Sequence, residues 1–136
     1  MAIVADTSAF MAVLLKEPDA ASFAKIFADV APVLVSTATV HEGNCVMIRR
    51  GIVDGLDRFG TMLALTNAQI VEFDEEQLEI AKGAYIKFGI GGQHVAELNM
   101  GDCFSYALAK SRGLPLLFKG NDFSQTDLIS AMSAYS

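Results

Sequence analysis

Four short apolar runs, separated by segments of helical composition, most constrain how this chain can fold. They lie at residues 2–5, 33–35, 70–73 and 116–118 and are rich in Val, Ile, Leu and Phe. A strand with apolar residues on both faces needs cover on both sides, which is typical of a parallel sheet. Alternation with helices indicates βαβ units. We therefore predict an α/β fold whose central parallel sheet has helices on both faces.

The helical segments have recognisable beginnings and ends. Helices are predicted over 9–16, from Pro18 onward, from Ser36 or Thr37 to near Gly51, over 52–65, and from a capping box at Asp74 and Gln77 to residue 88. A further helix opens at 101–102 and closes on Gly113, and Thr126 or Asp127 is expected to cap a last short helix. The 136 residues contain no repeat, linker or change of composition, so a single domain over 1–136 is expected.

Composition and charge exclude several classes of protein. The chain is 52% hydrophobic and 19% charged, which argues against disorder. Its longest apolar run, 9–15, is far shorter than the roughly 18 residues that span a bilayer, and no basic segment precedes an apolar one as in a signal peptide. The net charge of −6 is unlike that of a protein that binds nucleic acid by bulk electrostatics. Any nucleic-acid role must rest on local basic residues or on metal ions.

The cysteines and histidines give no metal-binding spacing. Cys45 and Cys103 lack a CxxC motif and have no neighbouring His, which argues against a zinc site and against a disulfide framework. Both are interpreted as small buried apolar side chains, and their number fits a reducing cytoplasm. His41 is expected to be packed or solvated, and His94 to be a loop residue that could meet a substrate.

Four acidic residues fall where the predicted topology would gather them. Asp6 ends the first strand, Asp122 follows the fourth, Asp102 starts the helix before that strand, and Glu42 lies in the helix after the second strand. Ligands of open parallel sheets bind at the carboxyl ends of the strands, and right-handed crossovers could bring all four acids there. Carboxylates that converge without basic partners repel each other unless a hard cation joins them. Mg²⁺ or Mn²⁺, which take oxygen ligands, fit this pattern.

Each acid taken alone has an ordinary structural alternative. Asp6 could cap a helix, and Glu42 could complete a capping box with Thr39. Asp102 could be favoured at its position only by the dipole of its helix, and Asp122 could belong to a turn. The joint pattern, and no single residue, favours a metal site. Asp127 is interpreted as a helix cap without a direct metal role.

Four segments in this order resemble one known family. They are 3–9 (IVADTSA), 38–42 (ATVHE), 98–109 (LNMGDCFSYALA) and 116–123 (LLFKGNDF), and together they extend over nearly the whole chain. The first is a weak signal alone, whereas the third and fourth are specific. The chain resembles PIN-domain ribonucleases, and among them the VapC toxins of bacterial type II toxin–antitoxin pairs.

The resemblance implies a fold, an activity and partners. It implies a PIN-like α/β/α sandwich and an endoribonuclease with Mg²⁺ or Mn²⁺ at Asp6, Glu42, Asp102 and Asp122, and with Ser8 orienting the site by hydrogen bonding. It further implies a homodimer that is inhibited by a VapB-type antitoxin. Operator DNA would be bound only through the antitoxin, and no membrane partner is expected. One departure is that relatives often carry basic residues in the loop before the third segment, whereas 89–94 here is neutral apart from His94.

Metal-dependent hydrolysis of phosphodiester bonds in RNA is the function that these features predict. Lys119 and Arg112 lie near the predicted edge and could contact phosphates, although surface solvation is the simpler role for each. The alternatives are a catalytically silent binding subunit and another Mg²⁺-dependent phosphoesterase on the same fold. The sequence does not choose among transfer, ribosomal and messenger RNA.

Apolar residues on the helices over 47–65, together with Tyr85, are expected to form the dimer interface. Residues 9–15 are expected either to line a groove that receives the antitoxin or to pack in the core.

Overall fold

The computed structural model describes residues 1–135. Four short strands alternate with seven helices among these residues. In chain order they are β1 (Ile3–Ala5), α1 (Thr7–Leu14), α2 (Ala20–Asp29), β2 (Val33–Ser36), α3 (Thr37–Arg49), α4 (Gly55–Leu65), β3 (Gln69–Val71), α5 (Glu75–Phe88), α6 (Met100–Arg112), β4 (Leu116–Leu117) and α7 (Ala131–Tyr135).

The strands form one parallel sheet in the order β3-β2-β1-β4. Alternate residues of each central strand enter opposite cores. Ile3 and Ala5 face one core while Val4 faces the other, and Leu116 and Leu117 divide in the same way. This division explains why β1, β2 and β4 are continuous apolar runs, because strands covered on both sides have no face in contact with water. The edge strand β3 differs, since Gln69 and Ile70 are exposed.

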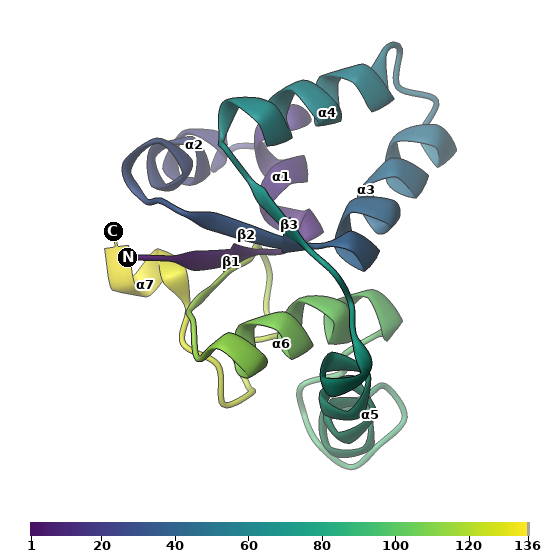
Figure 1. Ribbon diagram of the computed structural model, residues 1–136. Coiled ribbons are helices and arrows are strands. Elements are labelled where there is room, and N and C mark those ends of the chain that lie inside the picture. The colour runs from purple at the N-terminus through teal and green to yellow at the C-terminus, as the bar shows by residue number, and fades with distance from the viewer. Residues whose placement is uncertain (136) are drawn as a thin grey trace.

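Helices cover both faces of the sheet, as Figure 1 shows. Helices α1 to α4 lie on one face, where Phe10, Phe27 and Phe59 pack together. Helices α5 and α6 lie on the other face, around Phe88 and Leu108. The predicted α/β/α sandwich with a central parallel sheet is therefore confirmed.

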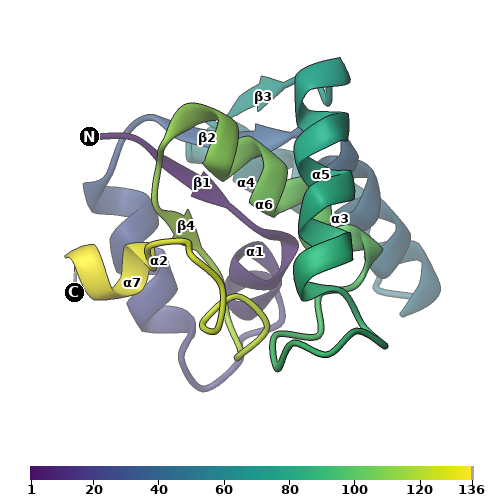
Figure 2. The ribbon, with the colours of Figure 1, turned by 90° about the horizontal axis from the view of Figure 1, so that it is seen from below.

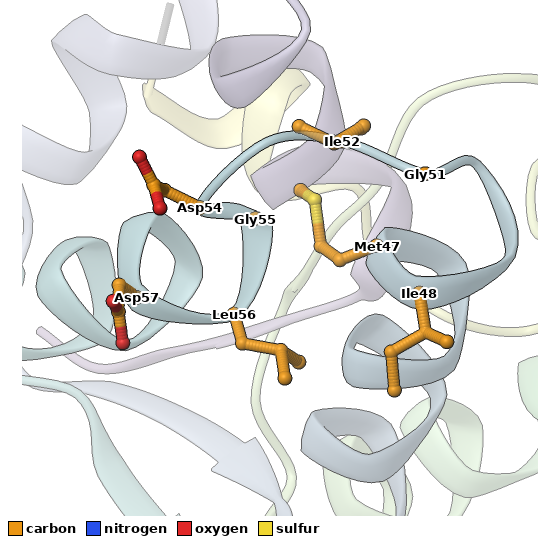
Figure 3. Close-up of a pocket in the computed structure, with 8 residues that line it drawn as sticks. All are labelled: Met47, Ile48, Gly51, Ile52, Asp54, Gly55, Leu56 and Asp57. Carbon is orange, nitrogen blue, oxygen red and sulfur yellow. The ribbon is translucent and has the colours of Figure 1, made fainter.

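The corner between α3 and α4 depends on two glycines. A Cβ atom at Gly43 would lie 2.7 Å from Cζ of Phe59, so only glycine lets α3 pack on that ring. Gly51, at φ +63°, ends α3 in the left-handed region that glycine favours. The turn then encloses a hollow of about 340 Å³ beside Met47 (Figure 3).

Three local predictions differ from the structure. The last helix begins at Ala131, so neither Thr126 nor Asp127 caps it. Helix α4 begins at Gly55 and not at residue 52. At the start of α5, Asp74 accepts a hydrogen bond from the Gln77 amide, but the Gln77 side chain donates to the carbonyl of Glu72, so the capping box is only half formed.

Among residues 1–135, no helix has the length and apolar character that crossing a membrane requires.

Candidate active site

Asp6 occupies the point where β1 ends and α1 begins. Its extended backbone makes it the N-cap of α1, and its side chain accepts hydrogen bonds at Oδ2 from the Ser8 amide (3.1 Å) and the Ser8 hydroxyl (2.7 Å). The Ser105 hydroxyl of α6 donates to Oδ1 at 2.5 Å. Burial raises the pKa of Asp6 although these hydrogen bonds oppose the rise. The capping role and the central position in the site therefore coexist.

Hydroxyl groups connect Asp6 to three neighbouring elements. Ser8 Oγ accepts a hydrogen bond from the Lys119 amide (2.9 Å), which ties the segment after β4 to the start of α1. Ser105 Oγ lies 3.3 Å from the Thr39 hydroxyl of α3. Ser105 and Thr39 are fully buried, so the orientation of the Asp6 carboxyl is fixed from both sides.

Glu42 projects from α3 toward the beginnings of α1 and α6. Its Oε1 accepts a short hydrogen bond from the Thr7 hydroxyl. Burial raises the pKa of Glu42, and the Asp6 charge adds to this, while Thr7 and Arg49 oppose it. The side chain is engaged by Thr7 and does not form the capping box with Thr39, because Ser36 caps α3 instead.

Asp102 lies in the first turn of α6 and forms a capping box with Asn99. The Asp102 amide donates to Asn99 Oδ1 (2.8 Å), and the Asn99 amide donates to Asp102 Oδ2 (2.9 Å). Burial raises the pKa of Asp102 to about 8, the Asn99 amide opposes the rise, and the charges of Asp6 and Asp122 add to it. The structure thus brings Asp6, Asp102 and Asp122 into electrostatic contact.

Asp122 is exposed in the turn that follows β4. The turn is held by the side chain of Ser124, which donates to the Asn121 carbonyl, and by the buried ring of Phe123. Seen from below in Figure 2, the loop before α6 and the loop after β4 lie toward the same side of the molecule as the start of α1. The four predicted acids therefore belong to one region, with Asp122 at its open side.

The carboxylate oxygens of this region fit a hard divalent cation in their chemistry, although the four side chains do not point at one common position. Across the described residues 1–135, no three acidic, histidine or cysteine side chains lie close enough together to hold one ion. Glu42 is turned to Thr7, and Asp102 to Asn99. All the candidate donors are carboxylate oxygens. Besides burial, the charge of Asp6 raises the pKa of Glu42, and the charges of Asp6 and Asp122 raise the pKa of Asp102, a repulsion that a hard cation relieves.

Two residues expected near phosphate or at a helix cap have other partners. Lys119 Nζ forms ion pairs with Asp19 (3.0 Å) and Glu17 (3.3 Å), so its amine is held away from the cluster by the segment between α1 and α2. Asp127 accepts hydrogen bonds from the Tyr106 hydroxyl (2.6 Å) and Lys110 Nζ (2.7 Å), which fastens the loop before α7 to α6. The prediction that Asp127 caps a helix is wrong.

The remaining predicted candidates are placed as follows. Arg112 is exposed at the end of α6, away from its first turn. His94 packs edge-on against Phe88, and its Nδ1 accepts a hydrogen bond from the Ala96 amide, so it is partly structural. Cys103 is buried as predicted, but Cys45 is only half-buried and contacts His41, which contradicts the expectation that neither cysteine has a neighbouring His.

Sequence reasoning missed the residues that orient the acids. Ser105, Thr7 and Asn99 each hold one of them. The Asn99–Asp102 spacing is a capping-box signal and could have been recognised. Ser105 could not, because it lies 99 residues from Asp6 in the chain.

The comparisons with known proteins agree on one family. The model of the PIN domain matches residues 3–128. Ribonuclease VapC of Mycolicibacterium smegmatis is 42% identical over 126 residues, which are 93% of this chain and 97% of that protein. Ribonuclease VapC30 of Mycobacterium tuberculosis is 43% identical over 127 residues, 93% of this chain and 95% of that protein.

Solved structures support the same fold. The crystal structure of Mycobacterium tuberculosis VapC20, described as a toxin that cleaves the sarcin-ricin loop, matches with a TM-score of 0.76 at 18% identity over 95% of this chain and 98% of that one. A toxin–antitoxin complex from Klebsiella pneumoniae matches with a TM-score of 0.69 at 17% identity over 96% and 97% of the two chains.

Proposed function

The chain belongs to the PIN-domain family, and from this premise we propose that it is the endoribonuclease toxin of a type II toxin–antitoxin pair. The observation that carries the proposal is Asp6, a buried carboxyl at the end of β1 that Ser8 and Ser105 hold and that Glu42 and Asp102 approach. The high identity to VapC ribonucleases over almost their whole length supports it. The whole chain acts as one domain in the cytoplasm.

Asp6, Asp102, Asp122 and Glu42 would hold Mg²⁺ or Mn²⁺, directly or through water. Such an ion, when bound, lowers the pKa of a water molecule and stabilises charge on the phosphate. Ser8 and Ser105 keep the Asp6 carboxyl in one orientation. Glu42 lies in α3, which follows β2 on the side of β1 away from β4, and it would orient a water or complete the ion's ligands.

RNA would reach the acids at the exposed turn that carries Asp122, where a phosphate could approach the bound cation. Arg112 is exposed but lies at the far end of α6 from Asp102. Lys119 is bound to Asp19 and Glu17, so it contributes to RNA binding only by leaving those partners. The acidic chain therefore depends on the cation and on few basic residues for phosphate binding.

A substrate panel tests the proposal against its alternatives. Purified protein is incubated with single-stranded and structured RNA, including transfer RNA, with DNA and with small phosphate esters, each in Mg²⁺, Mn²⁺ or chelator. Cleavage of RNA alone supports the ribonuclease. Faster turnover of DNA or of small phosphate esters than of RNA would indicate another phosphoesterase. No turnover of any substrate would indicate a catalytically silent binding subunit.

The exposed apolar surface supports a homodimer. Ile48, Val53 and Leu56 are between 49% and 80% exposed on or beside α3 and α4, and Tyr85 of α5 is 48% exposed. Burying such side chains against a second copy removes apolar area from water. Sedimentation at high protein concentration should show a dimer, and a monomer would contradict this.

A groove between α1, α2 and α4 suits the helix of an antitoxin. It contains adjoining hollows of about 400 and 260 Å³, both lined by Val13, Met62 and Leu65. Of the segment 9–15, Ala9 and Phe10 are core residues, whereas Val13 and Leu14 line the groove. An amphipathic helix could insert its apolar face there, while an Arg of the same inhibitor could pair with the acidic cluster.

A further inference from the structure

Helix α3 carries a histidine and a cysteine in contact on its outer surface. His41 and Cys45 lie one turn apart, and Nε2 of the ring is 3.6 Å from Sγ of the thiol. His41 is exposed and Cys45 is half-buried, so both atoms can be reached from solvent. Positions four apart on a helix share a face, which is why these side chains meet.

The distance between these two atoms is the one that a tetrahedral zinc ion requires. Zinc binds imidazole nitrogen at about 2.0–2.1 Å and thiolate sulfur at about 2.3 Å, so two such ligands at the tetrahedral angle lie about 3.5–3.6 Å apart. The observed 3.6 Å matches this separation. An S–H···N hydrogen bond would have a similar length, so the two arrangements must be separated by experiment.

We propose that His41 and Cys45 form a two-residue site for a thiophilic divalent cation such as Zn²⁺, with water in the open positions. Imidazole and thiolate ligands favour zinc, whereas carboxylates favour Mg²⁺ and Mn²⁺. The site thus differs in chemistry from the acidic cluster.

The site is also separate from the acidic cluster in space. Glu42 follows His41 directly in the chain, but its carboxylate turns inward to Thr7 and toward Gly101 of α6. His41 and Cys45 face outward on α3. Zinc bound to the pair would join two turns of the helix that carries Glu42, and it would stabilise the folded chain because the unfolded chain lacks the paired geometry.

Thiol protection tests the proposal on the whole protein. The rate of Cys45 alkylation by iodoacetamide is followed by peptide mass spectrometry with and without Zn²⁺. At zinc about tenfold above its Kd, mass action leaves about a tenth of the sites free, so the rate should fall about tenfold and return when EDTA is added. Cys103 is only 4% exposed and should react slowly in both conditions.

Variants show whether the protection of Cys45 by zinc depends on both His41 and Cys45. His41→Gln should abolish the zinc protection of Cys45, whereas His94→Gln, which removes the other histidine, should retain it. With Co²⁺ as probe, near-ultraviolet thiolate-to-cobalt absorption should appear in the native protein and in Asp102→Asn, and should be absent in Cys45→Ser. An unchanged alkylation rate in Zn²⁺, or protection that persists in His41→Gln, would overturn the proposal.

Discussion

Gly101 and Glu42 lie so close together that no side chain fits between them. A Cβ atom at position 101 would lie 2.6 Å from Cδ of Glu42 and closer still to its Oε2. The first turn of α6, which carries Asp102, can therefore approach the Glu42 carboxylate only because residue 101 is glycine.

Gly101→Ala should separate activity from stability. The methyl group would push the flexible end of Glu42 aside while alanine favours the helix by up to about 1 kcal/mol. We expect a free energy of unfolding that is unchanged or higher and RNA cleavage that is reduced by as much as about a hundredfold, because small displacements of positioning groups are costly. Urea unfolding and a cleavage assay measure the two effects.

Gly60→Ala is the matched control, because it lies in α4 and its Cβ would meet nothing within 4 Å. It should gain helix stability and keep full cleavage. A Gly101→Ala protein as active as the native one would show that the close approach to Glu42 has no role in the reaction.

Ser105→Ala should weaken the site by releasing Asp6 on one side. The substitution removes the donor to Asp6 Oδ1 and the neighbour of Thr39. Groups that orient a metal ligand typically contribute about 10–100-fold to affinity or activity, so a loss of that size is expected in Mg²⁺ affinity measured by calorimetry.

Ser111→Ala, on the same helix, provides the comparison, since Ser111 donates only to the Leu108 carbonyl. It should bind Mg²⁺ as the native protein does. Equal Mg²⁺ affinities for the Ser105 and Ser111 variants would refute the positioning role.

Stability of the metal-free protein should fall as pH rises. The folded state keeps the Asp102 proton up to a pKa of about 8, whereas the unfolded chain releases it near 3.8. Between these values the folded state binds more protons, so the free energy of unfolding decreases by up to about 1.4 kcal/mol per pH unit for this group and levels off above pH 8. The raised pKa values of Asp6 and Glu42 act in the same direction.

Urea unfolding in EDTA at a series of pH values measures this slope. Asp102→Asn should flatten it, and so should saturating Mg²⁺, because a cation stabilises the ionised carboxylates. Stability that rises over the same range would contradict the assigned burial of the acids.

The sequence predicted the sheet well because buried strands give local signals. Buried apolar runs mark β1, β2 and β4, and the ends of β1 and β4 mark Asp6 and Asp122 as candidate site residues. Partners far apart in the chain were not predictable. Lys119 contacts Asp19 across 100 residues, so it is not simply solvated, and Asp127 contacts Tyr106 and Lys110 and does not cap a helix.

One missed contact was local. His41 and Cys45 are four residues apart within a segment predicted to be helical, so helical spacing alone places them on one face. The signal for this pair is the helical i, i+4 spacing, and not a CxxC motif or a directly adjacent histidine.

An antitoxin that inserts Arg into the acidic cluster should compete with Mg²⁺. Calorimetric titration of the toxin with its antitoxin should give a weaker affinity in Mg²⁺ than in EDTA, because cation and guanidinium use the same carboxylates. Leu65→Glu, in the exposed wall of the groove, should weaken the complex in both buffers and leave RNA cleavage intact. Affinity that Mg²⁺ does not change would rule out the competition.

The cleavage of RNA by the three aspartate variants tests the account most directly. The native protein should cleave RNA in Mg²⁺ or Mn²⁺ and lose this activity in EDTA. Asp6→Asn, Asp102→Asn and Asp122→Asn should each fold and should each fail to cleave RNA. Above about pH 8, where the folded native protein ionises Asp102, the loss of one repelling charge should make each variant at least as stable as the native metal-free protein. Native cleavage in EDTA, or full Mg²⁺-dependent activity in any one of the three variants, would contradict the proposed metal site.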